Sequence, residues 1–124
     1  MRTVFGKGTK VETKRTSDGP AWQRALRDLA MELRALYGPR LRQILLHGSR
    51  ARGDAGHDSD VDVLVVLDPM GDFWEELSRV APPADRASLA YDVVLSVIPV
   101  DAAELDHGKR PFLINVRREG VAVD

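Results

Sequence analysis

The sequence predicts a single domain of the α+β class, with a small mixed β-sheet flanked by helices. Segments with apolar residues every three or four positions, as in helices, alternate with short apolar runs rich in Val, Ile and Leu, as in strands. The length of 124 residues suits one domain. A content of 44% hydrophobic and 30% charged residues is typical of a globular protein and excludes wholesale disorder.

The first predicted helix covers residues 20–37. Pro20 suits a first helical turn, and leucines recur behind it at spacings of three and four until Gly38-Pro39 ends the pattern. Residues 41–47 are apolar enough for a strand, and the β-branched run 61–67 predicts a second strand that is buried on both faces.

The second half of the chain is expected to continue the alternation. Asp72 can cap a short helix that runs to about Val80 and is ended by Pro82-Pro83. The remaining elements are a third strand from about Leu89 to Ile98, ended by Pro99, a helical turn over 101–106, a helix over 111–118 and a terminal strand over 121–123.

Composition excludes several classes of protein. The sequence has no cysteine, so it can form neither disulfides nor a thiolate zinc site and has no cysteine nucleophile. No apolar run approaches the ~20 residues of a membrane span, and the first residues lack the apolar core of a signal peptide. We expect a soluble, cytoplasmic protein.

Charge is unevenly distributed along the chain. Residues 1–52 carry 12 basic and 4 acidic side chains, and residues 53–124 carry 6 basic and 15 acidic ones. Residues 1–19 are glycine-containing, basic and poor in large apolar side chains, which predicts a flexible arm or a short hairpin preceding a domain over 20–124.

Two acidic residues, Asp60 and Asp62, stand where the second strand begins. Side chains two apart on a strand project to the same face, so the two carboxylates repel each other unless a cation lies between them. Hard oxygen ligands of this kind suit Mg²⁺ or Mn²⁺. An isolated Asp-x-Asp is more often an exposed loop or a turn cap, so this pair needs support from its surroundings.

Gly48-Ser49 supplies the first support. It follows a strand that looks buried, and glycine permits the close backbone approach that a phosphate needs. If residues 50–53 begin a short helix, the Ser49 hydroxyl and nearby backbone N–H groups face an anion. Taken alone, the pair is better explained as an ordinary tight turn.

Arg50 and Arg52 can add charge-assisted contacts to a phosphate. Packing, or salt bridges to Asp54 or Asp58, is an equally good interpretation of these two arginines.

Asp92 supplies the second support, because it interrupts the apolar residues of the predicted third strand. A charge inside a buried strand is costly unless it is paired or bound to a metal. The alternative is a strand-end aspartate paired with an arginine. His47, His57 and His107 lack the spacing of a Cys/His metal site, and we interpret His47 as a packing residue at a strand end.

Together, Gly48-Ser49, ten residues, Asp60-x-Asp62 and a later Asp92 resemble the DNA polymerase β-type nucleotidyltransferase superfamily. The segments 48–53 and 59–64 are most similar to the minimal nucleotidyltransferases of bacteria and archaea. The resemblance covers about residues 20–124 and implies the nucleotidyltransferase fold.

The resemblance also implies a role for each matching residue. Gly48 and Ser49 would hold the triphosphate of ATP or another nucleoside triphosphate. Asp60 and Asp62 would bind two ions of Mg²⁺ or Mn²⁺, and Asp92 would complete the cluster beside the acceptor hydroxyl. This agrees with the chemistry, because nucleotidyl transfer mainly requires alignment and neutralisation of charge.

The acceptor is expected to be a protein. Larger members of the superfamily carry a second domain for the acceptor, so we expect a partner protein or a second copy of this chain to complete the site. Similar minimal nucleotidyltransferases often act as antitoxins beside a HEPN-type toxin, and this resemblance implies transfer of AMP from ATP to a toxin side chain, typically tyrosine. Two alternatives remain: a binding module that neutralises its partner by contact, and an enzyme that modifies a small molecule such as an antibiotic. Neither a membrane nor a nucleic acid is expected as a partner.

Overall fold

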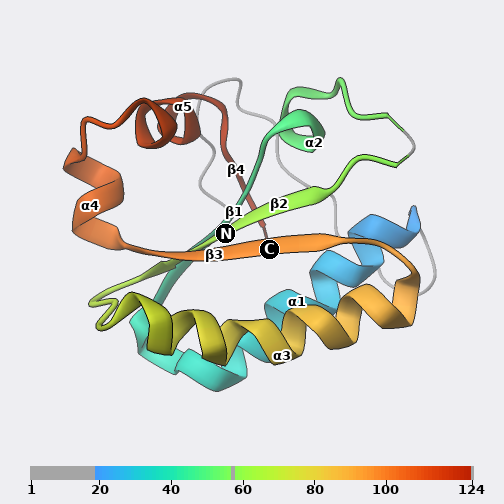
Figure 1. Ribbon diagram of the computed structural model, residues 1–124, viewed down its shortest axis with the longest axis horizontal. Coiled ribbons are helices and arrows are strands. Elements are labelled where there is room, and N and C mark those ends of the chain that lie inside the picture. Colours follow the sequence, from blue (N-terminus) through green and yellow to red (C-terminus); the bar gives the residue numbers. More distant parts are fainter. Residues whose placement is uncertain (1–18, 57, 124) are drawn as a thin grey trace.

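The computed structural model of the chain describes residues 19–56 and 58–123. A four-stranded mixed sheet lies at its centre, in the order β3-β2-β1-β4 (Figure 1). β1 pairs antiparallel with both β2 and β4, whereas β2 and β3 are parallel. The strands are β1 (Leu41–His47), β2 (Val61–Leu67), β3 (Leu95–Asp101) and β4 (Val121–Ala122). The predicted α+β class with a small mixed sheet is confirmed.

Helices cover the two faces of this sheet unequally. The long helices α1 and α3 lie side by side on one face, and the short helices α4 and α5 lie on the other (Figure 1). The short helix α2 lies on the same side as α5 (Figure 1), and an ion pair between Arg52 and Glu119 connects the two. The helical elements are α1 (Ala21–Tyr37), the 3-10 turn η1 (Gly38–Arg40), α2 (Ser49–Arg52), α3 (Phe73–Tyr91), α4 (Ala102–His107) and α5 (Pro111–Glu119).

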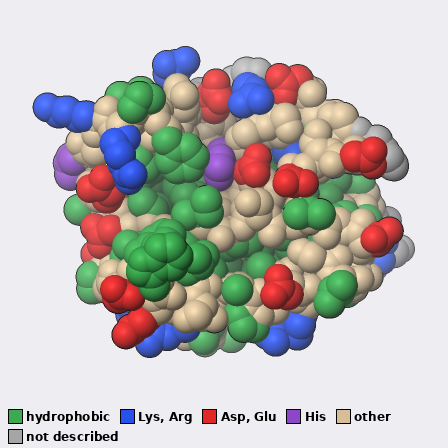
Figure 2. Space-filling view, viewed as in Figure 1, with side chains coloured by type: hydrophobic (Ala, Val, Ile, Leu, Met, Phe, Trp, Pro, Cys, Tyr) green, Lys and Arg blue, Asp and Glu red, His purple; other side chains and the backbone are tan. Residues whose placement is uncertain are grey.

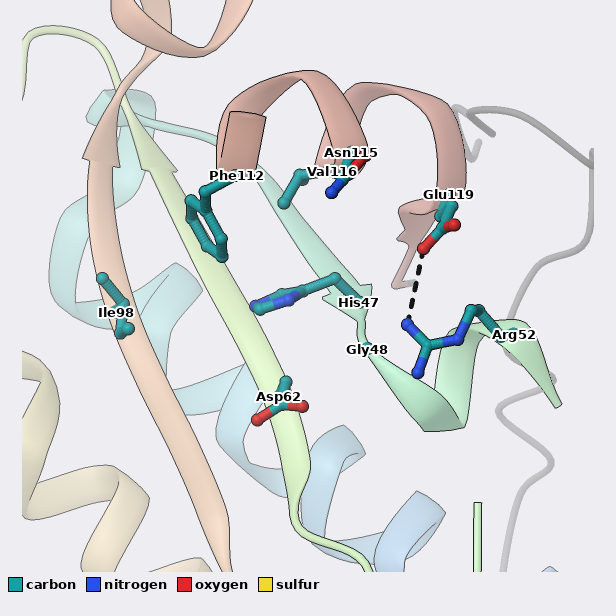
Figure 3. A pocket seen from close by; sticks show the side chains of 9 residues that line it. All are labelled: His47, Gly48, Arg52, Asp62, Ile98, Phe112, Asn115, Val116 and Glu119. Carbon is teal, nitrogen blue, oxygen red and sulfur yellow. Dashed lines mark ion pairs between the residues drawn. The ribbon is translucent and has the colours of Figure 1, made fainter. Parts of the chain in front are cut away.

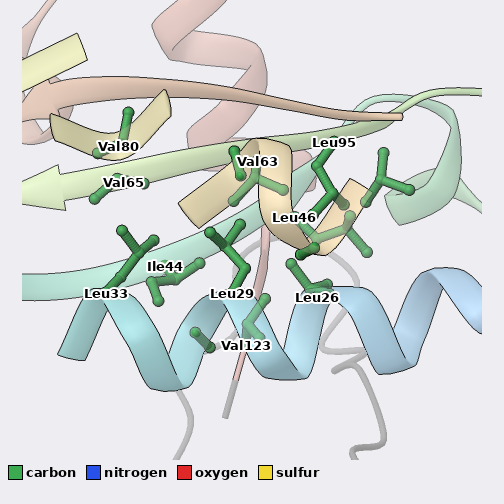
Figure 4. Close-up of a cluster of buried hydrophobic side chains, with 14 of the residues drawn as sticks. Leu26, Leu29, Leu33, Ile44, Leu46, Val63, Val65, Val80, Leu95 and Val123 are labelled. Atoms are coloured by element: carbon green, nitrogen blue, oxygen red, sulfur yellow. The ribbon is translucent and has the colours of Figure 1, made fainter. Parts of the chain in front are cut away.

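We call the face under α1 and α3 the closed face. Leu26, Leu29 and Leu33 of α1 are fully buried there and point at the sheet (Figure 4). They meet Ile44 and Leu46 of β1, together with residues of β2 and α3. Because each fully buried leucine contributes about 1.5–3 kcal/mol, this layer contains much of the stability of the fold.

We call the opposite face, under α4 and α5, the open face. Its buried cluster is smaller and is built from Leu45, Leu64 and Val66 of the sheet with Leu105 and Leu113 of the two helices. The helices there contain six and nine residues, so they cover only part of the sheet. The side chain of Asp62, near the start of β2, projects to this face, as do Leu64 and Val66.

The predicted end of the third helix at Pro82-Pro83 is wrong, because α3 runs through both prolines to Tyr91. Each proline removes one backbone N–H from the helix, but its fixed φ angle is compatible with helical geometry. Val80, Pro83 and Ala84 are buried against the closed face, and this packing offsets the missing hydrogen bonds.

The predicted third strand over 89–98 is therefore displaced. Residues 89–91 belong to α3, and β3 begins at Leu95, whose backbone N–H donates to Ser88 Oγ at 3.1 Å. Pro99 does not end the strand but lies within it, opposite Val65. It is tolerated because β3 is at the edge of the sheet, where one side of its backbone needs no partner strand.

The other predicted elements agree with the structure to within two residues. The strands over 41–47 and 61–67 have the predicted bounds, and the short helix after Gly48 is present as α2. The terminal strand contains Val121 and Ala122, and Val123 continues the contact through its N–H, which donates to Ile44 O at 2.9 Å. Residues 1–18 lie outside the described residues, so the basic arm or hairpin over 1–19 stays a prediction. Among the described helices, none is long and apolar enough to cross a membrane.

Candidate functional site

Gly48 marks the point where β1 turns into α2. Its φ of 73° and ψ of −155° lie in a region that is essentially restricted to glycine. A Cβ atom at this position would overlap Oδ2 of Asp62 on the neighbouring strand. The glycine is therefore needed both for the turn and for the close approach of the backbone to Asp62.

The turn after Gly48 is held by its own backbone. The carbonyl of Gly48 accepts from the N–H groups of Ala51 and Arg52, both at 3.1 Å. Ser49 is half-buried at the first position of α2, and Gly53 ends this helix in the left-handed conformation. The Gly48-Ser49 motif thus lies directly against the strand that carries Asp62.

Asp62 occupies the centre of a row across the sheet. Its Cα partners are His47 on β1 and Ser96 on β3, so the three side chains stand side by side on the open face. Asp60 lies two residues earlier, just before β2, and is exposed. The oxygen donors of Asp60, Asp62 and Ser96 suit a hard divalent cation such as Mg²⁺ or Mn²⁺.

A cavity of about 410 Å³ opens above this row, between the sheet and α5 (Figure 3). The sheet and the α2 turn contribute His47, Gly48, Arg52, Asp62 and Ile98 to its lining. The contribution of α5 is Phe112, Asn115, Val116 and Glu119, which recur at helical spacings of three and four. The motif residues Gly48 and Asp62 therefore share one cavity with a helix that carries no recognised motif.

His47 joins the two sides of the cavity. Its ring meets the ring of Phe112 edge to face, with the centroids 5.5 Å apart. Burial lowers the pKa of His47 below its ordinary value, and the negative charge of Asp62 partly opposes this effect. Nε2 is buried and has no hydrogen-bond partner among the described residues. His47 is thus a strand-end packing residue, as predicted, and it also lines the cavity.

The two arginines of α2 have different surroundings. The guanidinium of Arg50 lies over the ring of Trp22, 5.1 Å from its centroid, and Nη2 donates to Ser59 O at 3.1 Å. Arg52 instead lines the cavity, where Nη1 is 3.5 Å from Oε1 of Glu119, while Nε donates to Asp54 at 3.3 Å. Arg50 is thus a packing residue, and Arg52 forms ion pairs. Of the two, only Arg52 lines the cavity, where it could contact a bound ligand.

The predicted position of Asp92 inside a buried strand is wrong. Asp92 is exposed, has a φ of 54° and forms the left-handed C-cap of α3, three residues before β3 begins. Over residues 19–56 and 58–123, no three Asp, Glu, His or Cys side chains form a group that could hold a metal ion. The three-carboxylate cluster is therefore not assembled in this structure, because α3 is about three turns longer than predicted and Ser96 occupies the place beside Asp62.

Five further residues of the cavity lining were not predicted as site residues from the sequence: Ile98, Phe112, Asn115, Val116 and Glu119. The only sequence signal for the four that belong to α5 is the amphipathic spacing of the helix predicted over 111–118, which is equally expected of any helix that packs on a sheet. Their position becomes apparent only when α5 is placed over the end of β2.

Comparison with known proteins is consistent with this geometry. Residues 26–120 match the family model described as nucleotidyltransferase domain. Putative protein adenylyltransferase MJ0604 of Methanocaldococcus jannaschii is 34% identical over 100 residues, which are 79% of this chain and 93% of the relative. Putative protein adenylyltransferase MJ0141 of the same organism is 33% identical over 73 residues, 59% of this chain and 73% of the relative.

A solved structure shares the fold. The crystal structure of a putative nucleotidyltransferase from Sulfolobus solfataricus superposes with a TM-score of 0.52 at 23% identity, over 88% of this chain and 90% of that one. The family model alone spans most of the chain and includes Gly48, Asp60 and Asp62. The chain therefore belongs to the nucleotidyltransferase domain family and is a nucleotidyltransferase.

Proposed function

We propose that this nucleotidyltransferase transfers AMP from ATP to a hydroxyl group of a protein. The observation that carries the proposal is the close approach of Gly48 to Asp62 at one end of a cavity that Arg52 also lines. A glycine turn, a carboxylate and an arginine are groups that suit binding of a metal-complexed triphosphate. The names of both archaeal relatives include protein adenylyltransferase, which supports a protein as the acceptor.

The reaction follows from these groups. The oxygen of the acceptor hydroxyl forms a bond to the α-phosphorus of ATP, the bond from this phosphorus to the oxygen bridging to the β-phosphate breaks, and pyrophosphate leaves. The hydroxyl proton is released to water. Gly48 and Ser49 position the triphosphate, and Arg52 offers charge to its phosphates. Asp60 and Asp62 would hold Mg²⁺ or Mn²⁺, which when bound neutralises the triphosphate and makes the α-phosphorus more electrophilic.

The finer part of the proposal concerns the partner. We propose that the acceptor is a HEPN-type toxin, modified on a tyrosine, and that this chain acts as its antitoxin. The support is the similarity of residues 48–53 and 59–64 to minimal nucleotidyltransferases that act in such pairs.

The test is transfer of label from ATP. The full chain is incubated with α-phosphate-labelled ATP, Mg²⁺ and the product of the neighbouring reading frame, and labelled protein and released pyrophosphate are measured. We expect Mg²⁺-dependent labelling that Asp62→Asn reduces on the order of 10²- to 10³-fold, because a carboxylate that orients bound charge is lost. Asp85→Asn, an exposed substitution on α3, is the matched control and should label normally. Absence of label with every acceptor and cation would refute the enzymatic proposal.

A second candidate function is neutralisation of the partner by contact alone. The observation that favours it is Ser96, a neutral side chain, at the position beside Asp62. The double variant Asp60→Asn/Asp62→Asn separates the two functions. If it still neutralises the partner without transferring label, contact is the main activity.

A further inference from the structure

A second cavity, of about 510 Å³, lies next to the first on the open face. Its lining is mostly apolar and comes from the start of α3, from β3 and from the start of α5. The residues that matter for the argument are Met70, Phe73, Ile98, Pro99, Phe112 and Leu113. Hydrophobic side chains gather over this part of the surface, between α5 and the first turns of α3 (Figure 2). We call this second cavity the apolar groove.

The apolar groove is continuous with the cavity that contains Asp62. Ile98 and Phe112 line both, so these two side chains form the boundary between them. Both are partly exposed, at 39% and 44%. Beside the groove, Trp74 is 71% exposed and meets Phe73 edge to face at 5.1 Å. Large exposed apolar side chains that gather around a hollow are typical of a surface that binds another molecule.

The charged residues of the groove already have partners. Arg110 pairs with Glu104 at 3.5 Å. Oδ1 of Asp101 accepts from the N–H of Met70 at 2.9 Å, and its Oδ2 accepts from Ala103. The charged groups of the groove are therefore already ion-paired or hydrogen-bonded, and the surface that remains available is mainly apolar. A triphosphate would gain little there, in contrast to the cavity beside Gly48.

The register of the sheet gives the distance from Asp62 to the apolar groove. Ser96 lies opposite Asp62, and Ile98 and Val100 follow on the same face of β3. Two residues of a strand span about 7 Å, so the groove begins about 7 Å from the row of Asp62 and extends to about 13 Å. An extended peptide covers the same distances in two to four residues.

We propose that the apolar groove docks the acceptor protein, through an aromatic or large aliphatic side chain two to four residues away from the hydroxyl that is modified. This inference rests on the proposed function and adds how the acceptor is recognised. When the apolar side chain binds beside Ile98 and Phe112, the hydroxyl two to four residues away in the acceptor lies toward Asp62. The groove would thus fix the position of an acceptor segment so that its hydroxyl lies near Asp62.

Binding is tested first, without catalysis. Two peptides serve as probes: Ac-Gly-Trp-Gly-Gly-Tyr-Gly-amide, and the same peptide with glycine in place of tryptophan. The isotope-labelled full chain is titrated with each, and amide and methyl NMR shifts are recorded. We expect the tryptophan peptide to shift the signals of Phe73, Ile98 and Leu113 at concentrations at least about tenfold lower than the glycine peptide does. Equal effects of the two peptides, or shifts elsewhere only, would overturn the proposal.

Variants then assign the contact. Trp74→Asp should weaken binding of the tryptophan peptide about tenfold and leave binding of ATP unchanged. Leu89→Asp is the matched control, because Leu89 is 85% exposed near the other end of α3 and should affect neither ligand. Sedimentation of both variants and the wild type shows whether a second copy occupies the groove instead. Self-association that Trp74→Asp abolishes would refute an acceptor as the occupant.

The two proposals fail in different ways. If the tryptophan peptide binds the groove but no AMP is transferred to its tyrosine or to any protein, the enzymatic proposal is refuted, whereas the groove is still shown to bind an apolar side chain. If label is transferred equally well to both peptides, and Trp74→Asp leaves their KM values unchanged, the enzymatic proposal stands and the docking role of the groove is refuted.

Discussion

The two faces of the sheet differ in how completely helices cover them, and in what they can do. On the closed face, helices of 17 and 19 residues bury a continuous cluster that includes Leu26, Leu29 and Leu33. On the open face, helices of six and nine residues leave a cavity of about 410 Å³ that Asp62 lines and the adjoining apolar groove of about 510 Å³. Stability is concentrated on one face, and this allows the other to remain partly uncovered for ligands.

Truncating one leucine on each face tests this comparison directly, and the closed face should give the largest effect. Leu29→Ala should lower the free energy of unfolding by about 3–4 kcal/mol, because it leaves a void in a layer that cannot collapse. Leu113→Ala, equally buried on the open face, should cost only about 2 kcal/mol, because it enlarges a cavity that already exists. Urea unfolding of both variants measures the difference, and equal costs would contradict the comparison.

The next effect concerns the turn that forms the open-face site. Gly48→Ala should lower the free energy of unfolding by about 2–3 kcal/mol, since alanine is strained at this φ and its Cβ would also displace the Asp62 carboxylate. Gly53→Ala is the matched control: its φ of 85° is also positive, but a Cβ there meets no described atom within 4 Å. Its cost should be about 1 kcal/mol. Similar losses in the two variants would show that the contact with Asp62 is unimportant.

A smaller effect is expected from the charged cluster that joins the helices of the closed face. The buried Glu76 accepts hydrogen bonds from Tyr37 and Arg79, both at 3.0 Å, and also from Arg40. Burial alone would raise the pKa of Glu76, but these hydrogen bonds lower it below its ordinary value of 4.5. Glu76→Gln should therefore cost about 2 kcal/mol at pH 7, whereas Glu75→Gln at the exposed neighbouring position should cost almost nothing.

The same cluster predicts a dependence on pH. Because the pKa of Glu76 is lower in the folded state, its contribution is complete above pH 4.5 and is lost as the pH falls through the folded-state value. The pKa of Tyr37 is raised to about 12 by burial and by its bond to Glu76, so its contribution is lost as the pH rises from about 10 toward 12. The free energy of unfolding should thus fall more steeply from pH 5 to pH 3 in the wild type than in Glu76→Gln. Equal dependence on pH in the two proteins would contradict this role of Glu76.

The closed face was largely predictable from the sequence, because it depends on local patterns. The leucine spacing of residues 20–37 and the β-branched run 61–67 are strong periodic signals, and α1 and β2 follow them closely. On the open face, the nearness of Gly48 and Asp62 was implied only by the family resemblance of the two motifs, and the close approach of Gly48 to the Asp62 carboxylate agrees with it. The enzymatic roles of these residues stay predictions.

The open face was less predictable, because it depends on long-range packing. Pro82-Pro83 is a strong local signal for the end of a helix, and only the burial of α3 on the sheet overrides it. Displacement of the third strand then moved Asp92 to a helix C-cap and placed Ser96 beside Asp62. The cavity residues Phe112, Asn115 and Glu119 carry no motif, and their position is set by how the short helix α5 is docked.

The smallest expected effect on stability is also the one that distinguishes the two interpretations of Arg52. Glu119 pairs with Arg52 at 3.5 Å in the lining of the open-face cavity, and both side chains are partly exposed. Glu119→Gln should leave Tm unchanged to within roughly 1 °C, as should Glu104→Gln, which breaks a surface pair of the same length. If Arg52 contacts the triphosphate, Glu119→Gln should tighten binding of ATP roughly two- to fivefold, because it removes a competing carboxylate. Glu104→Gln should not change ATP binding. Equilibrium dialysis with labelled ATP measures both variants, and unchanged affinity for Glu119→Gln would leave Arg52 as a structural partner of α5.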